Sequence, residues 1–77
     1  MSDNKVYRAI VYAAKSGQLK EPFGMKEFRE KCPGFAQNTY RTFLHKHRQD
    51  NPGGQSELFV LVVKGQFRLL RPFKYGL

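Results

Sequence analysis

Residues 32–48 read CPGFAQNTYRTFLHKHR, which places a helix break immediately before an amphipathic helix. Proline cannot continue a helix, so residues 32–34 (Cys-Pro-Gly) end the segment that precedes them. Beyond this break four side chains keep the i, i+3, i+4, i+7 spacing of one buried helical face. They are Tyr40, Phe43, Leu44 and His47. The pattern predicts a helix that begins with a cap at Asn38 or Thr39 and runs to about Arg48.

Two further helices are predicted on the N-terminal side of the break. The first starts at a cap on Asp3 or Asn4, and Gly17 ends it in a left-handed conformation. Its apolar face consists of Val6, Tyr7, Ile10, Val11, Ala13 and Ala14. An extended link follows, because Pro22 interrupts any helix, and a short second helix then covers residues 25–31. The predicted buried side of this second helix is Met25, Phe28 and Cys32.

Residues 57–70 predict a β-hairpin, because β-branched and aromatic residues flank a Lys-Gly turn at residues 64–65. Two registers fit this segment. A two-residue turn pairs Val62 with Phe67 and puts on one face Leu58, Val60, Val62, Phe67 and Leu69. A three-residue loop with a left-handed glycine pairs Val62 with Gln66 and puts on one face Phe59, Leu61, Phe67 and Leu69. We favour the second register, because the turn of the first requires positive φ at the lysine as well.

The composition describes one small basic domain. The 77 residues include 14 Lys and Arg against 6 Asp and Glu, a net charge of +8. We expect a single domain over residues 1–77, with a helical part at 3–49, a hairpin at 57–70 and a tail at 71–77. So short a chain has little room for a two-lobed enzyme with a deep pocket. A charge this high indicates an anionic partner, namely nucleic acid, an anionic membrane surface or an acidic protein.

Other features limit the compartment and the chemistry. The longest apolar run, residues 58–63, is far shorter than a membrane span, and no apolar signal segment follows the polar N-terminus. With a single cysteine, the sequence indicates a reducing compartment, and we expect a cytoplasmic or nucleoid-associated protein with no membrane partner. His45 and His47 lie on different helical faces, so we expect no metal site. The sequence contains no convincing catalytic pair or triad, so we also expect no catalytic residues and no cofactor. Packing accounts better than base stacking for the periodic aromatic residues Phe28, Phe43, Phe59 and Phe67.

The order of elements (helix, extended link, helix, tight turn, helix, hairpin) resembles the winged helix-turn-helix family of DNA-binding domains. The similar segments are residues 23–28, 38–44 and 57–69. The resemblance implies an α+β fold of three helices and a two-stranded antiparallel wing, without enzymatic activity. It also implies that helix three reads the major groove of double-stranded DNA, most commonly in transcription regulation.

The resemblance assigns the DNA contacts to the third helix and the wing. Base edges would be read from Gln37, Asn38, Arg41, Thr42 and His45, with Thr39 at the same helix end. Phosphate contacts would come from Lys46 and Arg48, and backbone or minor-groove contacts from Lys64, Gln66 and Arg68. Four basic residues and no acidic residue lie in residues 31–48, which agrees with this assignment.

The hairpin also suggests a different function. In the favoured register its second face holds the apolar residues Leu58, Val60, Val62 and Leu70. The helices of so small a domain cover only one sheet face, so either the tail covers this surface or a partner does. The alternative to DNA binding is therefore a protein-interaction or homodimerisation module that uses this apolar face.

Overall fold

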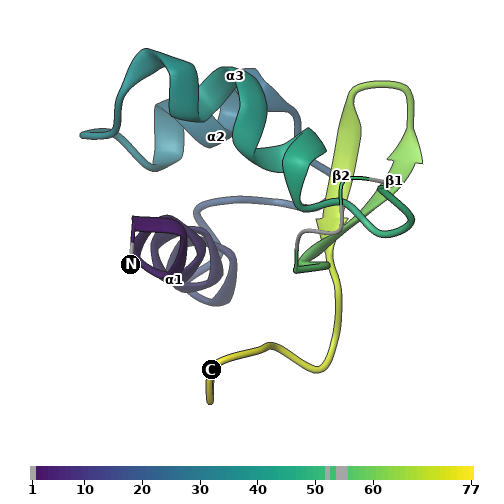
Figure 1. Ribbon diagram of the computed structural model, residues 1–77. Helices are drawn as coiled ribbons and strands as arrows, with labels where there is room; N and C mark the ends of the chain where they lie inside the picture. Colours follow the sequence, from purple (N-terminus) through teal and green to yellow (C-terminus); the bar gives the residue numbers. More distant parts are fainter. Residues whose placement is uncertain (1, 52, 54–55) are drawn as a thin grey trace.

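The computed structural model describes residues 2–51, 53 and 56–77, and the side chains of residues 2–4 lie outside the described part. Three helices precede a two-stranded antiparallel hairpin, which confirms the predicted α+β class. The elements are α1 (Ser2–Lys15), α2 (Met25–Lys31), α3 (Gln37–Lys46), β1 (Phe59–Val63) and β2 (Gln66–Leu69). Figure 1 shows α1 on one side of the interior, α2 and α3 on the other, and the hairpin next to the end of α3.

Helix α1 buries the face that its periodicity predicts. Val6, Tyr7, Ile10, Val11 and Ala13 are buried and Ala14 is partly buried. Gly17 ends the helix at φ +83°, as expected for a left-handed terminus. The helix begins at Ser2, ahead of the predicted cap, and the side chains of Asp3 and Asn4 lie outside the described part of the chain.

Helix α2 has the predicted bounds, but one residue of its predicted buried side is wrong. Phe28 and Cys32 are buried, whereas Met25 is exposed. Met25 is the first residue of a seven-residue helix, and Phe23, two residues earlier, fills that end of the interior instead.

Helix α3 buries Tyr40, Phe43 and Leu44, followed by His47, so the predicted stripe is confirmed. The predicted N-cap lies two or three residues too late, and the predicted end lies two residues too late. The N-cap is Ala36, whose carbonyl accepts from the N–H groups of Thr39 and Tyr40, so Asn38 and Thr39 lie inside the helix. The helix ends at Lys46, because the His47 carbonyl leaves the helical pattern to accept from the N–H groups that open the hairpin.

The hairpin has the favoured register along its body and a different arrangement at its tip. Phe59 pairs with Leu69 and Leu61 with Phe67, as predicted. The predicted Val62–Gln66 pair is wrong. Val62 bulges out of the ladder, and Gln66 pairs with Val63, the residue after the bulge. Gly65 adopts φ +76°, so the glycine supplies the positive φ that the turn needs.

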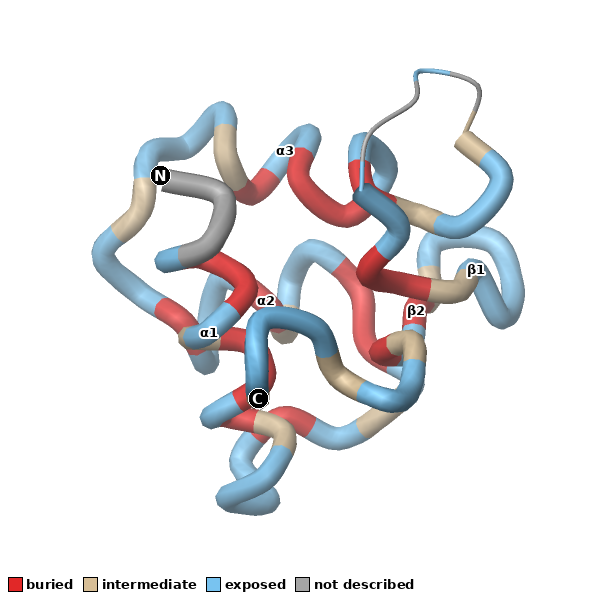
Figure 2. Tube along the Cα trace, turned by 60° about the horizontal axis from the view of Figure 1, so that its bottom comes forward, coloured by how far each residue is buried: buried red, intermediate tan, exposed pale blue. Residues whose placement is uncertain are grey.

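One residue of the α1–α2 link forms an isolated bridge to β2 of the hairpin. Phe23 in the α1–α2 link exchanges two backbone hydrogen bonds with Phe67, both 2.8 Å long. The link therefore lies beside β2 on the edge opposite β1. The buried residues of the helices, the link and the hairpin belong to one cluster, and Figure 2 shows where they lie along the chain.

The tail, residues 71–77, contacts α1. The Tyr7 hydroxyl accepts from the Lys74 N–H at 2.9 Å, and Phe73 and Leu77 pack against the buried cluster.

The predicted outward position of Leu58 is wrong. Leu58 is part of the core, and its carbonyl accepts from the Leu70 N–H.

Candidate nucleic-acid interface

The outward face of α3 gathers most of the predicted base-reading side chains. Because Tyr40, Phe43 and Leu44 point into the core, the opposite side of the helix faces solvent. Its exposed residues are Gln37, Asn38, Arg41, Thr42, His45 and Lys46. Thr39 is half-buried at the margin, and the Thr42 hydroxyl donates to the Asn38 carbonyl at 2.9 Å.

The turn between α2 and α3 is held by the side chain of Tyr40. Its hydroxyl donates to the Cys32 carbonyl at 2.6 Å and accepts from the Phe35 N–H at 3.1 Å. Its ring packs edge-on against Phe28 of α2, with 5.0 Å between ring centroids. These contacts fix the direction of α3 relative to α2, and therefore the direction of its outward face.

The hairpin is joined to the outward face of α3 through two rings. His45 packs edge-on against Phe67 of β2, with 5.1 Å between centroids. The basic side chain of Lys64 lies at the exposed hairpin turn. The structure thus brings the outward face of α3 and the hairpin into one surface.

Two predicted wing residues do not share that surface. Side chains alternate along a strand, and β2 points Phe67 and Leu69 into the core, so Gln66 and Arg68 point to the other face of the sheet. The Gln66 side chain lies against Gly24 at the start of α2.

Arg48, which was predicted to contact phosphates, follows α3 and is half-buried. It forms a parallel bridge with Phe59.

The charge of this surface is basic. Residues 31–49 and 58–70, which include α3 and the hairpin, contain no Asp or Glu. The acidic residues that border these ranges are Glu30 of α2 and, between α3 and β1, Asp50 and Glu57. The Glu57 carboxylate accepts from the Asp50 N–H at 3.0 Å. The surface therefore suits a polyanion.

Residues with metal-binding or nucleophilic chemistry do not gather anywhere in the described part of the chain. Its His, Cys, Asp and Glu side chains form no group of three that could hold a metal ion. Cys32 is buried below the α2–α3 turn, and burial raises the pKa of its thiol. His47 is buried and shares a hydrogen bond of 2.9 Å between Nδ1 and the Ser56 carbonyl.

The exposed apolar surface of the hairpin differs from the predicted one. Val60 and Leu70 are half-buried, and of the four predicted residues only Val62 is exposed. The exposed apolar residues of β1 are instead Leu61, Val62 and Val63, with 41–57% of their surface accessible. Leu61 shares the inward face of the hairpin but is too close to the turn to be covered by core residues. The exposure of Val63 follows from the bulge at Val62, which the sequence does not predict.

Comparison with known proteins gives no match to any family model, curated protein or solved structure. Within the described residues, no helix has both the length and the apolar character needed to cross a bilayer.

Proposed function

We propose that this chain is a non-enzymatic winged helix-turn-helix domain that binds double-stranded DNA. The observation that carries the proposal is the polar, basic outward face of α3, presented next to the hairpin by a helix whose other face is buried. A helix of this kind fits the major groove, which is about 12 Å wide. The hairpin then acts as the wing, with Lys64 reaching the phosphate backbone.

The side chains of α3 suit direct readout of base edges. Arg41 is able to donate two hydrogen bonds to guanine, and Asn38 is able to form two with adenine. Lys46 lies at the other end of the helix, where phosphate contacts would position the domain. The N-cap Ala36 has no side-chain acceptor, which leaves the first-turn N–H groups suited to a phosphate. A regulator of transcription in the cytoplasm or nucleoid is the role that this mechanism serves most directly.

The test uses fluorescence anisotropy to measure binding to a labelled random duplex of about 20 base pairs at several salt concentrations. Three to five phosphate contacts give a slope of roughly −3 to −5 for log K against log salt. We expect Arg41→Glu with Lys46→Glu to abolish duplex binding, because both reversals put like charge against phosphates. Circular dichroism checks that the double variant keeps its fold.

Lys20→Glu with Lys74→Glu is the matched control, because it changes the net charge equally at exposed positions outside α3 and the hairpin. We expect this variant to keep most of the duplex affinity. Equal losses in both double variants would mean that net charge alone governs binding, and unchanged binding after the α3 reversals would refute the assignment of α3.

The exposed apolar residues of β1 favour a second candidate function, a protein-interaction or dimerisation module. If the wild type binds no duplex at low salt, sedimentation velocity becomes the deciding experiment. A dimer that Val62→Lys converts to a monomer would support this second function. A monomer at high concentration would exclude homodimerisation through this surface.

A further inference from the structure

The outward face of α1 carries a stripe of three cations and one aromatic ring. Lys5, Arg8, Tyr12 and Lys15 are all exposed. Their spacing of three, four and three residues aligns them along one side of the helix over about 15 Å. Tyr12 is 72% exposed, more than any other large apolar side chain that the structure describes. Core packing therefore does not explain this tyrosine.

A shallow hollow lies beside the Tyr12 ring. Its volume is about 380 Å³, and its lining combines apolar and basic side chains: Arg8, Ala9, Val11, Tyr12, Lys15 and Leu77. One wall is held in place, because the Lys15 ammonium donates to the Leu77 carbonyl at 3.0 Å and lies 5.4 Å from the centroid of the Phe73 ring. The hollow thus offers a flat apolar contact beside cations.

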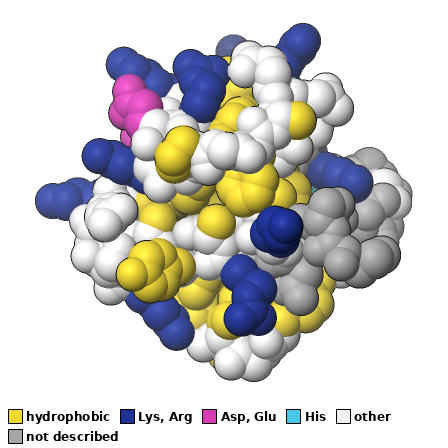
Figure 3. All heavy atoms as spheres, turned by 90° about the vertical axis from the view of Figure 1, so that its left-hand side faces the viewer, with side chains coloured by type: hydrophobic (Ala, Val, Ile, Leu, Met, Phe, Trp, Pro, Cys, Tyr) yellow, Lys and Arg dark blue, Asp and Glu magenta, His cyan; other side chains and the backbone are white. Residues whose placement is uncertain are grey.

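The charged side chains of this face that the structure describes are all basic. Residues 5–20 contain four Lys and Arg and no Asp or Glu. The acidic residue of α1, Asp3, has a side chain outside the described part, and Lys5 and Arg8 pair with no carboxylate that the structure describes. Figure 3 views the side of the molecule where α1 lies. In its lower part Lys and Arg side chains surround apolar groups, and acidic side chains appear only at the upper left.

We propose that the outward face of α1 binds single-stranded nucleic acid, with one base stacked on Tyr12 and phosphates bound by Lys5 and Arg8. Aromatic rings between cations are the usual platform for single strands, because every unpaired base has a face to stack. A duplex hides those faces within its own stack. The cations on both sides of Tyr12 also disfavour an apolar protein partner, which would have to desolvate them.

This site is separate from the outward face of α3. Both helices bury their inner faces in the same core, and α1 lies across the interior from α3 (Figure 1). The two surfaces can therefore be inactivated one at a time, and the proposal for α1 does not depend on duplex binding by α3.

The experiment measures binding of labelled dT12, which forms no duplex, to the Arg41→Glu/Lys46→Glu protein. This background removes the α3 contacts. We expect dT12 still to bind, and Tyr12→Ala in that background to weaken binding on the order of tenfold, as for loss of one stacked base. Tyr12→Phe keeps the ring and should keep the affinity. Tyrosine fluorescence gives a second readout, because dT12 binding should quench it less in the Tyr12→Ala variant.

One matched comparison decides the role of charge. Arg8→Glu should weaken dT12 binding clearly more than Lys20→Glu, which makes the same charge change off the stripe. Equal effects of these two variants, or unchanged binding after Tyr12→Ala, would overturn the proposal. Loss of all dT12 binding in the α3 double variant alone would also overturn it, because single strands would then use the α3 face.

Discussion

At the scale of single residues, Tyr40 determines how the outward face of α3 is presented. The spacing of apolar residues predicts that this side chain is buried, but periodicity carries no information about the partners of its hydroxyl. Those partners are the backbone groups of Cys32 and Phe35, in the turn that the proline and glycine of residues 33–34 create. One oxygen atom therefore connects a helix to the turn that precedes it.

Tyr40→Phe keeps the ring against Phe28 and removes only that oxygen. The Cys32 carbonyl and the Phe35 N–H then lose their partner, and leaving a buried polar group unsatisfied costs about 1–3 kcal/mol. We expect the free energy of unfolding in urea to fall by this amount. A change below about 0.5 kcal/mol would show that water replaces the hydroxyl at no cost, which would contradict a structural role for the bond.

At the scale of elements, the start of α2 and the hairpin turn are in direct backbone contact. A Cβ atom at Gly24 would lie 2.8 Å from the Gly65 carbonyl oxygen and 3.1 Å from Nε2 of Gln66. The sequence identifies Gly65 as the turn residue, because only glycine adopts its φ at no cost. It gives no sign that Gly24 is needed for close approach, since that need arises only when two segments about 40 residues apart meet.

Gly24→Ala should therefore displace the hairpin turn and lower stability by about 1–3 kcal/mol, the usual cost of overpacking. Gly34→Ala is the control for the hairpin contact. Its φ of +100° strains an alanine and lowers stability too, but no atom lies within 4 Å of its Cβ position. Amide chemical shifts of residues 64–66 should move in the first variant and stay in place in the second. Unmoved hairpin amides after Gly24→Ala would contradict the contact.

At the scale of the whole molecule, the unpredicted features are the contacts between distant segments. Helix periodicity and the hairpin register could be predicted because each depends on residues close in the chain. The pairing of Phe23 with Phe67 and the packing of the tail on α1 leave no periodic pattern. The predicted DNA-contact set shows the same division, since the α3 residues lie together, whereas Gln66 and Arg68 turn away with the opposite face of β2.

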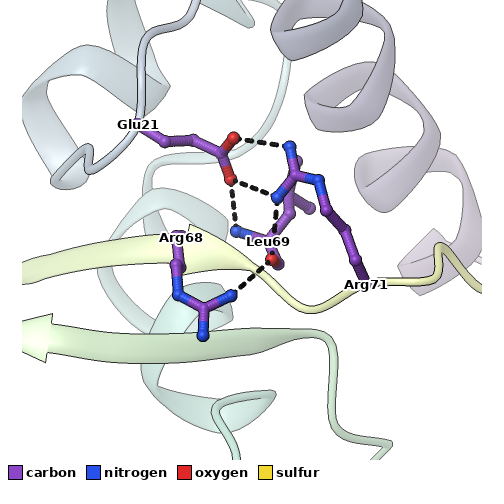
Figure 4. A network of polar contacts seen from close by, with 4 residues as sticks. All are labelled: Glu21, Arg68, Leu69 and Arg71. Atoms are coloured by element: carbon purple, nitrogen blue, oxygen red, sulfur yellow. Dashed lines mark hydrogen bonds and ion pairs between the residues drawn. The ribbon is translucent and has the colours of Figure 1, made fainter.

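The Glu21 carboxylate joins three of these distant segments (Figure 4). The Glu21 carboxylate of the α1–α2 link accepts from Arg71 of the tail, with 2.7 Å between Oε1 and Nη2. Its other oxygen accepts from the Leu69 N–H of β2 at 2.6 Å. The hydrogen bond from Arg71, supported by the one from Leu69, lowers the pKa of Glu21 against the opposing effect of burial.

This shift makes the stability of the fold dependent on acid. As pH falls through the ordinary glutamate pKa of about 4.3, the unfolded chain binds a proton before the folded chain does. Glu21 therefore stabilises the fold near neutral pH, and this contribution is lost progressively as pH falls toward the lower pKa of the folded state. We expect Glu21→Gln to lower the urea unfolding free energy at about pH 6.5 and to change it much less at about pH 3. Some acid dependence should remain, because the hydrogen bond from the Gly24 N–H lowers the pKa of Glu27 in the same direction.

Glu30→Gln is the control. Glu30 lies on the exposed side of α2, so this variant removes the same charge and keeps the Glu21–Arg71 pair. Equal losses from the two variants at both pH values would show that net charge, and not this pair, couples the tail to the sheet.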